Sequence, residues 1–404
     1  MEENLAASDF DVHYHLKFVR KCLLLLGIWP LDSKRSWKPL YTFYFWLTFV
    51  YYIIFDISGA VLAIKTWSEN YLTTASSFGI VIEYVSNAYK VLIFKSKTYK
   101  QLIAYIAQKE KKIFNSQDEE FLKIYKENAA FTRKIVYFYV SMGSTGISLY
   151  FITPLISNVV YPLGYNNITG VKEHHFIVFS YFPFDANRYY WAAYLIQFTG
   201  CFYGYAYIVY CGAFYITLIT FVTGELKILQ HLFVNFRKYS NKFQEQYSLT
   251  EEQSQILLLK KLVKEHLKII RFVEQLNDSI KLFMLLNFVI SSFQLSLVVY
   301  QILQLPLIKQ ITVFSYFITL STQLFLVYNS AHEISVQSEN VATSIFKSDW
   351  YTYSPKIKRM MLIVCIRSQK PLVMTIGPTW SVQVTSLFQI FKALYSYVCI
   401  IMRN

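Results

Sequence analysis

Four charged residues lie within long apolar stretches of this 404-residue sequence: Asp56, Glu83, Lys90 and Lys392. A charge in such surroundings is costly and usually faces protein or water. Glu83 and Lys90 are seven positions apart, so they share one face of a helix. Counting along each stretch places Asp56, Glu83 and Lys392 at similar depth, which would allow a carboxylate to contact Lys392. Structural pairing is the usual reason for such charges, and a role in gating is the alternative.

Few other side chains have the spacing that chemistry needs. The adjacent pair His174–His175 contains metal-ligating groups, but neighbouring side chains point apart, so a solvated pair is the simpler interpretation. The five cysteines form no CxxC pattern and imply neither a zinc site nor a disulfide framework. No nucleophile–base or metal spacing stands out in the apolar stretches. We therefore predict that the chain is not an enzyme and requires no cofactor.

The last stretch, Thr375–Asn404, contains an unusual helical face. After the breaker Gly377–Pro378 the chain runs apolar over roughly the 20 residues that cross a membrane. One face at helical spacing mixes small, polar and aromatic groups: Gln389, Ala393, Ser396, Tyr397, Ile400 and Asn404. Such a face suits a water-filled path better than lipid. Packing within the chain's own bundle is the simpler explanation, and spacing alone leaves both open.

The elements that must position these residues are membrane-spanning helices. Hydrophobic residues make up 54% of the chain and charged residues only 16%, against about 25% charged in soluble proteins. The apolar residues are concentrated in seven runs long enough to span a bilayer: Leu40–Ile64, Leu72–Phe94, Phe131–Tyr161, Trp191–Val222, Ile280–Leu303, Leu307–Tyr328 and Thr379–Ile401. The sequence predicts an all-α polytopic membrane protein with seven transmembrane helices.

The net charge of +14 is distributed by topology and does not indicate nucleic-acid binding. Segments on one side of the membrane carry 32 of the 39 Lys and Arg residues, and segments on the other side carry five. The positive-inside rule then predicts a cytosolic N-terminus and, after seven spans, an extracellular C-terminus. The sequon at Asn167 falls outside the cell, where it could be glycosylated. The long loop that contains it, Pro162–Tyr190, is of the kind that covers a pocket.

This topology divides the chain into six parts. They are a cytosolic N-terminal segment with an interfacial helix (1–39), transmembrane helices 1–4 (40–222), cytosolic anchor helices (223–278), transmembrane helices 5–6 (279–330), a cytosolic anchor segment (331–378) and the last transmembrane helix (379–404). In the N-terminal segment, Phe18–Asp32 is too short to span and predicts an amphipathic helix at the membrane surface, with Trp29 as its anchor.

The anchor helices contain a second regular pattern. Ser248 to Glu251 reads SLTE, a capping box that opens a helix. A seam at alternating spacings of three and four then runs into the fifth span: Leu259, Leu262, His266, Ile269, Val273, Leu276, Ile280 and Phe283. The seam predicts packing either within the chain or between subunits.

Two patches carry a resemblance to a known family. The segment from Ser348 to Asn404 resembles the C-terminal signature of insect odorant receptors through DWY, KIKRMMLIVCIRSQKPL and SLFQIFKALYSYVCII. The stretches LLLLGIWP and HLKIIRFVEQLND fit the same family, as do the length and the predicted topology. Gustatory receptors fit less well, because VCIIMRN follows Tyr397 where that family has a Gln-Phe ending.

The resemblance implies a subunit of a tetrameric ligand-gated cation channel of the odour-specific type, assembled in the plasma membrane of a sensory neuron with a common co-receptor. It implies that the last helix lines the pore. Carrying over the terminal Tyr-hydrophobic run places the gate at Tyr397 and Ile400, with Asn404 near the mouth and Ala393 on the same face. A ring of isoleucines would close such a pore by dewetting.

The resemblance also implies a site for a small volatile molecule in the outer half of the bundle. Gly143, Gly146 and Tyr150 resemble the family's small-small-aromatic wall. Further residues are expected there from their position alone: Phe78, Ile82, Phe198, Phe202, Phe314 and Phe317. Such a pocket would hold an apolar ligand by shape and dispersion.

Two other classes of membrane protein remain as alternatives. A seven-helix G-protein-coupled receptor would require an extracellular N-terminus, contrary to the distribution of basic residues. A transporter would favour internal repeats and interrupted helices at mid-membrane, and no repeat is visible in the sequence. An odorant receptor subunit that contacts lipid, a volatile ligand and co-receptor subunits is therefore the favoured prediction.

Overall fold

The computed structural model describes residues 13–31, 36–67, 71–116, 118–160, 164–166, 171–305, 307–378 and 380–403. Most of these residues are helical, which confirms the predicted all-α class. The helices are α1 (Lys17–Leu25), α2 (Lys38–Lys65), α3 (Tyr71–Phe94), α4 (Lys97–Asn115), α5 (Glu119–Val160), α6 (Tyr190–Val234), α7 (Phe236–Tyr247), α8 (Glu251–Gln304), α9 (Leu307–Phe346), α10 (Pro355–Ser368) and α11 (Val384–Arg403). A 3-10 turn, η1 (Trp350–Thr352), precedes α10.

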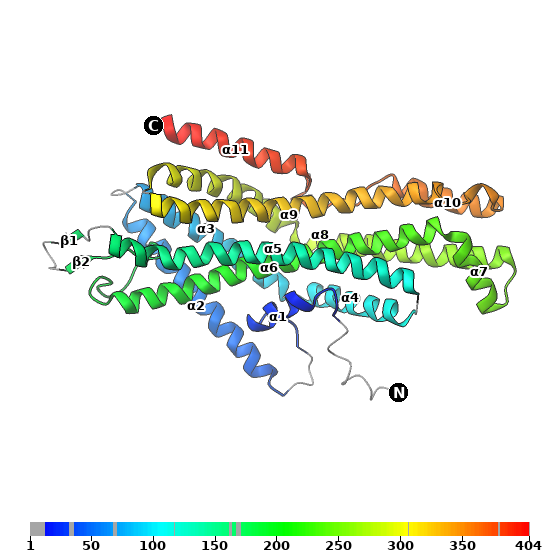
Figure 1. Cartoon of the computed structure of the whole chain (residues 1–404), viewed down its shortest axis with the longest axis horizontal. Coiled ribbons are helices and arrows are strands. Elements are labelled where there is room, and N and C mark those ends of the chain that lie inside the picture. Colours follow the sequence, from blue (N-terminus) through cyan, green and yellow to red (C-terminus); the bar gives the residue numbers. More distant parts are fainter. Residues whose placement is uncertain are drawn as a thin grey trace.

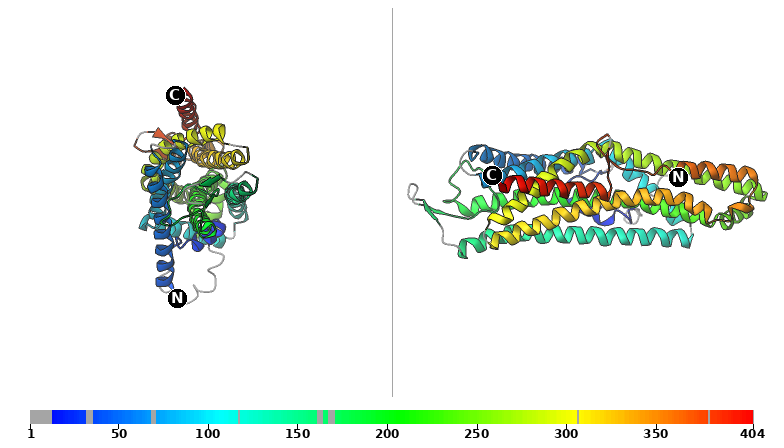
Figure 2. Two further views of the ribbon diagram at one scale, coloured as in Figure 1. Left: turned by 90° about the vertical axis from the view of Figure 1, so that its left-hand side faces the viewer. Right: turned by 90° about the horizontal axis from the view of Figure 1, so that it is seen from above.

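The helices form one elongated bundle, seen from the side in Figure 1. Helix α6 packs against α5, α8 and α9, and these long helices run along most of the molecule. A small antiparallel hairpin, β1 (Gly164–Asn166) with β2 (Val171–Glu173), lies at one end, which we call the hairpin end. Helices α7 and α10 lie at the opposite end, which we call the far end. Helix α11 lies along the side of the bundle and stands away from the other helices in the end-on view of Figure 2.

Among the described residues, six helices are long and apolar enough to cross a membrane: α2, α3, α5, α6, α8 and α9. Four of them continue well beyond a membrane thickness. Helix α8, for example, has 54 residues and therefore a length of about 80 Å at 1.5 Å per residue. The seventh predicted span corresponds to α11, whose apolar part Val384–Ile400 is close to the lower length for a spanning helix, about 17 residues.

A short second hairpin precedes α11. Strand β3 (Thr375–Ile376) pairs antiparallel with β4 (Trp380–Ser381), and Gly377 turns the chain at φ +62°. The side chain of Asn277 on α8 accepts a hydrogen bond from the Thr375 amide at 2.7 Å. The Gly377 amide donates to the Lys281 carbonyl at 3.0 Å. These bonds fix the start of α11 against α8.

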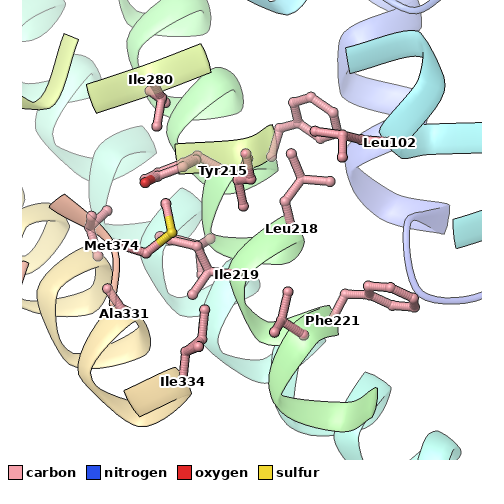
Figure 3. Close-up of a cluster of buried hydrophobic side chains, with 14 of the residues drawn as sticks. Leu102, Tyr215, Leu218, Ile219, Phe221, Ile280, Ala331, Ile334 and Met374 are labelled. Atoms are coloured by element: carbon pink, nitrogen blue, oxygen red, sulfur yellow. The ribbon is translucent and has the colours of Figure 1, made fainter. Parts of the chain in front are cut away.

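Helix α6 is the centre of the core. In its apolar window 89% of the residues are buried within the chain, because other helices surround it. Figure 3 shows its side chains packed between α4, α8 and α9. The labelled residues of this cluster are Leu102, Tyr215, Leu218, Ile219, Phe221, Ile280, Ala331, Ile334 and Met374. Unbroken burial of this kind explains why the α6 sequence is apolar on every face.

The structure differs from the sequence prediction at α1. The apolar residues of this segment face the protein, and Val19, Leu23 and Trp29 are buried. The Trp29 ring contacts the Phe214 ring of α6 edge to face at 6.3 Å between centroids. Trp29 is therefore a packing residue in the described structure and not a membrane-surface anchor. A short amphipathic helix has the same sequence pattern whether it covers lipid or protein, so the pattern alone could not distinguish them.

The N-terminal segment is held by a buried carboxylate. Glu110 of α4 accepts hydrogen bonds from the His15 amide at 2.7 Å, the Tyr14 amide at 3.1 Å and the Tyr125 hydroxyl at 2.5 Å. Burial raises the pKa of Glu110 to about 7, against the effect of these hydrogen bonds. Residues close to the N-terminus are thereby attached to α4 and α5.

The capping box of α8 also differs from its predicted register. Thr250 is the N-cap, and its hydroxyl accepts a hydrogen bond from the Gln253 amide at 3.4 Å. The side-chain oxygen of Gln253 in turn accepts a hydrogen bond from the Thr250 amide at 3.1 Å. Ser248 instead ends α7 in a left-handed conformation with φ 51°. Both Ser248 and Thr250 are residue types that can cap the start of a helix. Here Ser248 is the C-cap of α7, and Thr250 is the N-cap of α8.

The seam of α8 packs within the chain. All eight of its residues, from Leu259 to Phe283, are buried among other helices of the same chain. A buried ion cluster lies beside it, where Lys109 pairs with Glu225 at 2.8 Å and also with Glu265. These two carboxylates raise the pKa of Lys109 despite its burial. Of the two options for the seam, packing within one chain is the one the structure supports.

Candidate functional site

A cavity of about 300 Å³ lies near the hairpin end, and we call it the outer cavity. Its roof is formed by residues of the loop between β2 and α6, from His174 to Phe182. Its walls come from α3, α5, α8 and α9. The wall residues include Gly79, Ile80, Tyr150, Thr153, Pro154, Gln294, Leu297, Val298, Gln301, Lys309, Thr312 and Val313. Its volume is at the lower end of the range of small-molecule sites, about 300–1,000 Å³.

Two side-chain amides hold the roof of the outer cavity in place. Gln197 of α6 accepts from the Ile177 amide at 2.9 Å and donates to the Val178 carbonyl at 2.8 Å and the Ser180 hydroxyl at 2.6 Å. Asn158 of α5 accepts from the His175 amide at 2.6 Å. The loop therefore has a defined conformation over the cavity, in agreement with the expectation that it covers a pocket.

A smaller cavity of about 100 Å³ lies deeper between the helices, and we call it the inner cavity. Residues of α3, α5, α6 and α9 line it, among them Glu83, Tyr84, Gly143, Gly146, Cys201, Tyr205, Tyr316, Thr319 and Gln323. Ile80, Tyr150 and Val178 line both cavities, so they form the partition between them. The two cavities thus follow one another from the hairpin end into the bundle.

Two glycines shape the inner cavity. A Cβ atom at Gly143 would lie 2.8 Å from a methyl group of Val209, and one at Gly146 would lie 3.3 Å from the Thr319 hydroxyl. The missing side chains allow α5 to approach α6 and α9 closely, as small residues do in membrane helices. They also leave the space that the cavity occupies.

The cavities are mainly apolar and contain a few fixed polar groups. Gln294 donates a hydrogen bond to the Tyr316 hydroxyl, and the Tyr316 ring meets the Tyr150 ring edge to face at 6.1 Å. The side-chain oxygens of Gln294 and Gln323 are buried without a hydrogen-bond partner among the described residues. A ligand that donates a hydrogen bond could satisfy such an oxygen. This combination can bind a small apolar molecule that carries a polar group.

The structure brings three of the nine predicted ligand residues together. Gly143, Gly146 and Tyr150 all line the inner cavity, and Tyr150 lines the outer cavity as well. The other six do not line either cavity: Phe78, Ile82, Phe198, Phe202, Phe314 and Phe317. Phe314, for example, is 52% exposed on the outside of α9, and Phe202 is also exposed.

Helical periodicity explains this division. The lining residues of α6 include Gln197, Cys201, Tyr205 and Ile208, at spacings of four and three, and Val209 follows the last of them. Phe198 and Phe202 follow two of them by one position and therefore point about 100° away. The same offset separates Phe317 from Tyr316 on α9. The residues chosen by position lie on helices that wall the bundle, but they point away from the two cavities. A binding role for these six residues stays a prediction.

The predicted pore face is exposed on the single chain. Helix α11 packs on the bundle through Leu387 and Ile390, which are buried. Gln389, Ser396 and Tyr397 are exposed, Ile400 is 60% exposed, and Ala393 is half-buried. Asn404 lies outside the described residues, as does the sequon residue Asn167. The face is thus available to a further helix or to water, and its role in a pore stays a prediction.

The charged residues of the apolar stretches occupy different surroundings. Glu83 is buried and accepts from the Asn87 amide group at 2.7 Å, while the Lys90 ammonium lies 5.2 Å from the centre of the Phe283 ring. Asp56 is buried on α2. Lys392 is exposed on α11 and has no ion pair within the described part of the chain. The structure therefore gives no contact between Lys392 and the two carboxylates.

Sequence reasoning missed the buried amides Gln197, Gln294 and Gln323. Each is an amide within an apolar span, and such a group favours a hydrogen-bond partner inside the protein. That signal could have indicated a polar site on α6, α8 and α9. Which partner each amide contacts depends on the packing of distant helices and has no local signature.

A long helical membrane bundle with ligand-sized cavities beneath an ordered loop is the architecture of a multi-pass membrane receptor. Comparison of the sequence with known families identifies the class of receptor, because the profile of the 7tm odorant receptor family matches residues 70–395. The chain belongs to this odorant receptor family. The plasma membrane of sensory neurons is the location typical of it. Family membership confirms the prediction that the chain is not an enzyme.

Individual relatives are distant. Odorant receptor 10 of Aedes albopictus is 23% identical over 211 residues, covering 52% of this chain and 54% of the relative. Odorant receptor Or2 of Anopheles gambiae is 25% identical over 146 residues, covering 36% and 39%. Odorant receptor 30a of Drosophila melanogaster is 22% identical over 189 residues, covering 46% and 47%. The chain thus matches about half or less of the length of these relatives.

Solved structures share the fold over nearly the whole chain. The insect olfactory receptor OR5 from Machilis hrabei in complex with eugenol has a TM-score of 0.80 at 15% identity, covering 98% of this chain and 99% of that chain. The OR5 structure described without eugenol has a TM-score of 0.76, also at 15% identity, with 96% and 97% covered. Similarity at this identity shows the fold of the chain.

Proposed function

We propose that the chain is an odour-specific subunit of a ligand-gated cation channel, which binds a small volatile molecule in the cavities of the hairpin end and opens a pore lined by α11. The observation that carries the proposal is the pair of adjoining cavities, walled by α3, α5, α6, α8 and α9 within an odorant receptor fold. The fold neighbour described in complex with eugenol supports a small organic ligand. Co-receptor subunits would complete a tetramer.

The proposed route from ligand to pore follows α8 and α9. Both helices contribute walls to the outer cavity, and α11 packs against both. The Ser296 hydroxyl of α8, which donates to the Ser292 carbonyl at 2.7 Å, also lies 3.4 Å from the Leu394 carbonyl of α11. A ligand that displaces α8 or α9 would therefore move the surface on which α11 rests. In this proposal residues 223–278 and 331–378 form the cytosolic anchor, with the N-terminus in the cytosol and the C-terminus outside.

The proposal is tested by expressing the chain with an odorant co-receptor and recording current while a panel of volatiles is applied. We expect at least one volatile to evoke an inward cation current. Replacing Tyr150 by Ala should raise the half-maximal concentration about tenfold or more, because the ring walls both cavities. Phe325→Ala is the matched control, since that ring is exposed on α9 and lines neither cavity. Surface expression without any evoked current would contradict the proposal.

The pore assignment has a separate test. Ile400→Ala should raise the resting conductance, because a smaller side chain widens the constriction and lowers the barrier to wetting. Phe388→Ala is the control, since Phe388 is an equally exposed apolar residue on another face of α11. An unchanged leak in Ile400→Ala, or an equal leak in both variants, would remove Ile400 from the gate.

A further inference from the structure

The outer cavity has a one-sided charge. Its lining contains one lysine and two histidines, Lys309, His174 and His175, and among the described lining residues there is no aspartate or glutamate. The rest of the wall is uncharged, and apolar residues such as Leu297, Val298 and Val313 form much of it. A molecule in this cavity therefore meets a single cationic corner within an apolar space.

The cation at this corner is Lys309. Its ammonium lies 3.4 Å from Nδ1 of His175, and it forms no ion pair with a carboxylate within the described part of the chain. Burial lowers the pKa of His175, and the nearby Lys309 and His174 lower it further. An ammonium can only donate, so Nδ1 of His175 accepts the hydrogen bond from Lys309. The half-buried Lys309 ammonium thus has no carboxylate counter-charge within the described part of the chain.

The surrounding backbone makes the same corner more positive. Lys309 lies in the first turn of α9, which begins at Leu307, and the first N–H groups of a helix have no partner within the helix. A lysine is unfavourable at this end of the helix dipole, whereas an anion is favourable. In addition, Nδ1 of His174 is buried without a hydrogen-bond partner among the described residues.

We propose that the outer cavity binds the anion of a short- to medium-chain carboxylic acid, with the carboxylate at Lys309 and the alkyl chain along the apolar wall. An ammonium and a carboxylate form a charge-assisted hydrogen bond, which is about twice as strong as a neutral one. Leu297, Val298 and Val313 provide the surface for the alkyl chain. The inference deepens the proposed function, on which it rests, by naming the ligand class of the outer cavity.

The test uses the purified full-length chain in lipid nanodiscs and three six-carbon probes: hexanoate, 1-hexanol and hexylamine. They share an alkyl chain and differ in the charge of the head group. We expect hexanoate to raise the thermal unfolding temperature most, 1-hexanol to raise it less and hexylamine to have no effect. Equal shifts for hexanoate and 1-hexanol in the unmodified chain would overturn the proposal without any variant.

Variants then locate the charge. Lys309→Met should weaken hexanoate binding about tenfold or more and leave 1-hexanol binding unchanged, because a charged hydrogen bond is lost and the apolar wall remains. Lys309→Arg should retain the preference for hexanoate. Lys172→Met is the matched control, since Lys172 is exposed on β2 and does not line the cavity. Unaltered hexanoate binding in Lys309→Met would refute the assignment.

The binding assay and the current assay fail independently. Currents evoked by neutral volatiles, together with no preference for hexanoate, would leave the proposed function intact and refute the carboxylate site. Binding of hexanoate that depends on Lys309, in a chain that never passes current, would support the site and contradict the channel.

Discussion

The two ends of the bundle are built from the same helices and differ in how completely they are filled. Helix α6 runs through both. Toward the hairpin end it contributes Gln197, Cys201 and Tyr205 to the cavity walls. From Cys211 to Leu226 every one of its residues is buried, and part of this stretch forms the cluster of Figure 3. The comparison shows that the fold does not by itself produce the cavities.

Buried polar groups also differ between the two ends. At the far end the buried Lys109 ammonium pairs with the two carboxylates of Glu225 and Glu265, although one Glu225 oxygen has no hydrogen bond among the described residues. At the hairpin end Lys309 has no carboxylate partner within the described chain, and the Gln294 oxygen has no hydrogen bond there. A buried cation with carboxylate partners stabilises one conformation, whereas a cation without one leaves a charge for a ligand to satisfy. The far end is therefore expected to be sensitive to mutation, and the hairpin end sensitive to ligands.

The largest effect is expected from removing the cation of the far-end cluster. Lys109→Ala leaves Glu225 as a buried carboxylate without its cation, whereas Glu265 keeps Lys268 at 2.7 Å, so the free energy of unfolding should fall by about 3 kcal/mol. Thermal unfolding of the purified chain measures the change. Lys111→Ala, at an exposed lysine of the same helix, should change the stability by less than about 0.5 kcal/mol. Equal effects in the two variants would break the comparison.

The next effect concerns pH. Burial raises the pKa of Glu110 from 4.5 to about 7, so the folded state favours the protonated carboxyl group. The stability that this group contributes is fully present below pH 4.5 and is lost as the pH rises to about 7, by an amount of about 3 kcal/mol or less. Glu110→Gln should remove this part of the decline in unfolding temperature between pH 5 and pH 8. Glu127→Gln, at an exposed position, should keep the decline of the unmodified chain.

A matched pair of glycines compares the two ends directly. At the far end, a Cβ at Gly224 would lie 2.5 Å from the Asn128 amide nitrogen, which donates to the Thr220 carbonyl at 2.9 Å. Gly224→Ala should therefore cost about 1–3 kcal/mol of stability by overpacking. At the hairpin end, Gly146→Ala places its methyl group in the inner cavity, 3.3 Å from Thr319. A loss of stability in Gly146→Ala as large as that in Gly224→Ala would contradict the contrast between a filled far end and a hairpin end that contains cavities.

The smallest effect on stability should accompany a clear effect on ligands. Gly146→Ala should alter the unfolding temperature little and shift the response of the receptor toward smaller volatiles, because the added methyl group reduces a cavity of about 100 Å³. Recording responses to a homologous series of alcohols or esters measures the shift. An unchanged order of responses would separate the inner cavity from ligand recognition.

The spanning helices were predictable because a membrane imposes length and composition on the sequence. The runs ending at Phe94 and Leu303 lie in α3 and α8 as expected. The wall formed by Gly143, Gly146 and Tyr150 was found through the resemblance to the family. The faces of Phe198 and Phe314 were not found, since one position along a helix changes the direction by about 100°. Composition does not specify that rotation.

Long-range attachments were also beyond prediction. The burial of Trp29 against Phe214 and the bonding of Glu110 to the His15 amide join segments far apart in the chain. Their local sequences are compatible with a membrane surface or a solvated helix. Only the packing of distant helices decides between those environments, and a single sequence carries no direct record of that packing.

The hydrogen bonds that attach the loop over the outer cavity affect how long a ligand stays bound. Gln197 makes three hydrogen bonds with the loop, to the Ile177 amide, the Val178 carbonyl and the Ser180 hydroxyl. For a molecule that leaves past these residues, breaking three bonds of about 1 kcal/mol each makes the open loop about a hundredfold rarer. Departure slows by a similar factor. The amide of one buried glutamine would then govern how long a receptor continues to signal after the odour has gone, and so how well an animal resolves successive puffs in a plume.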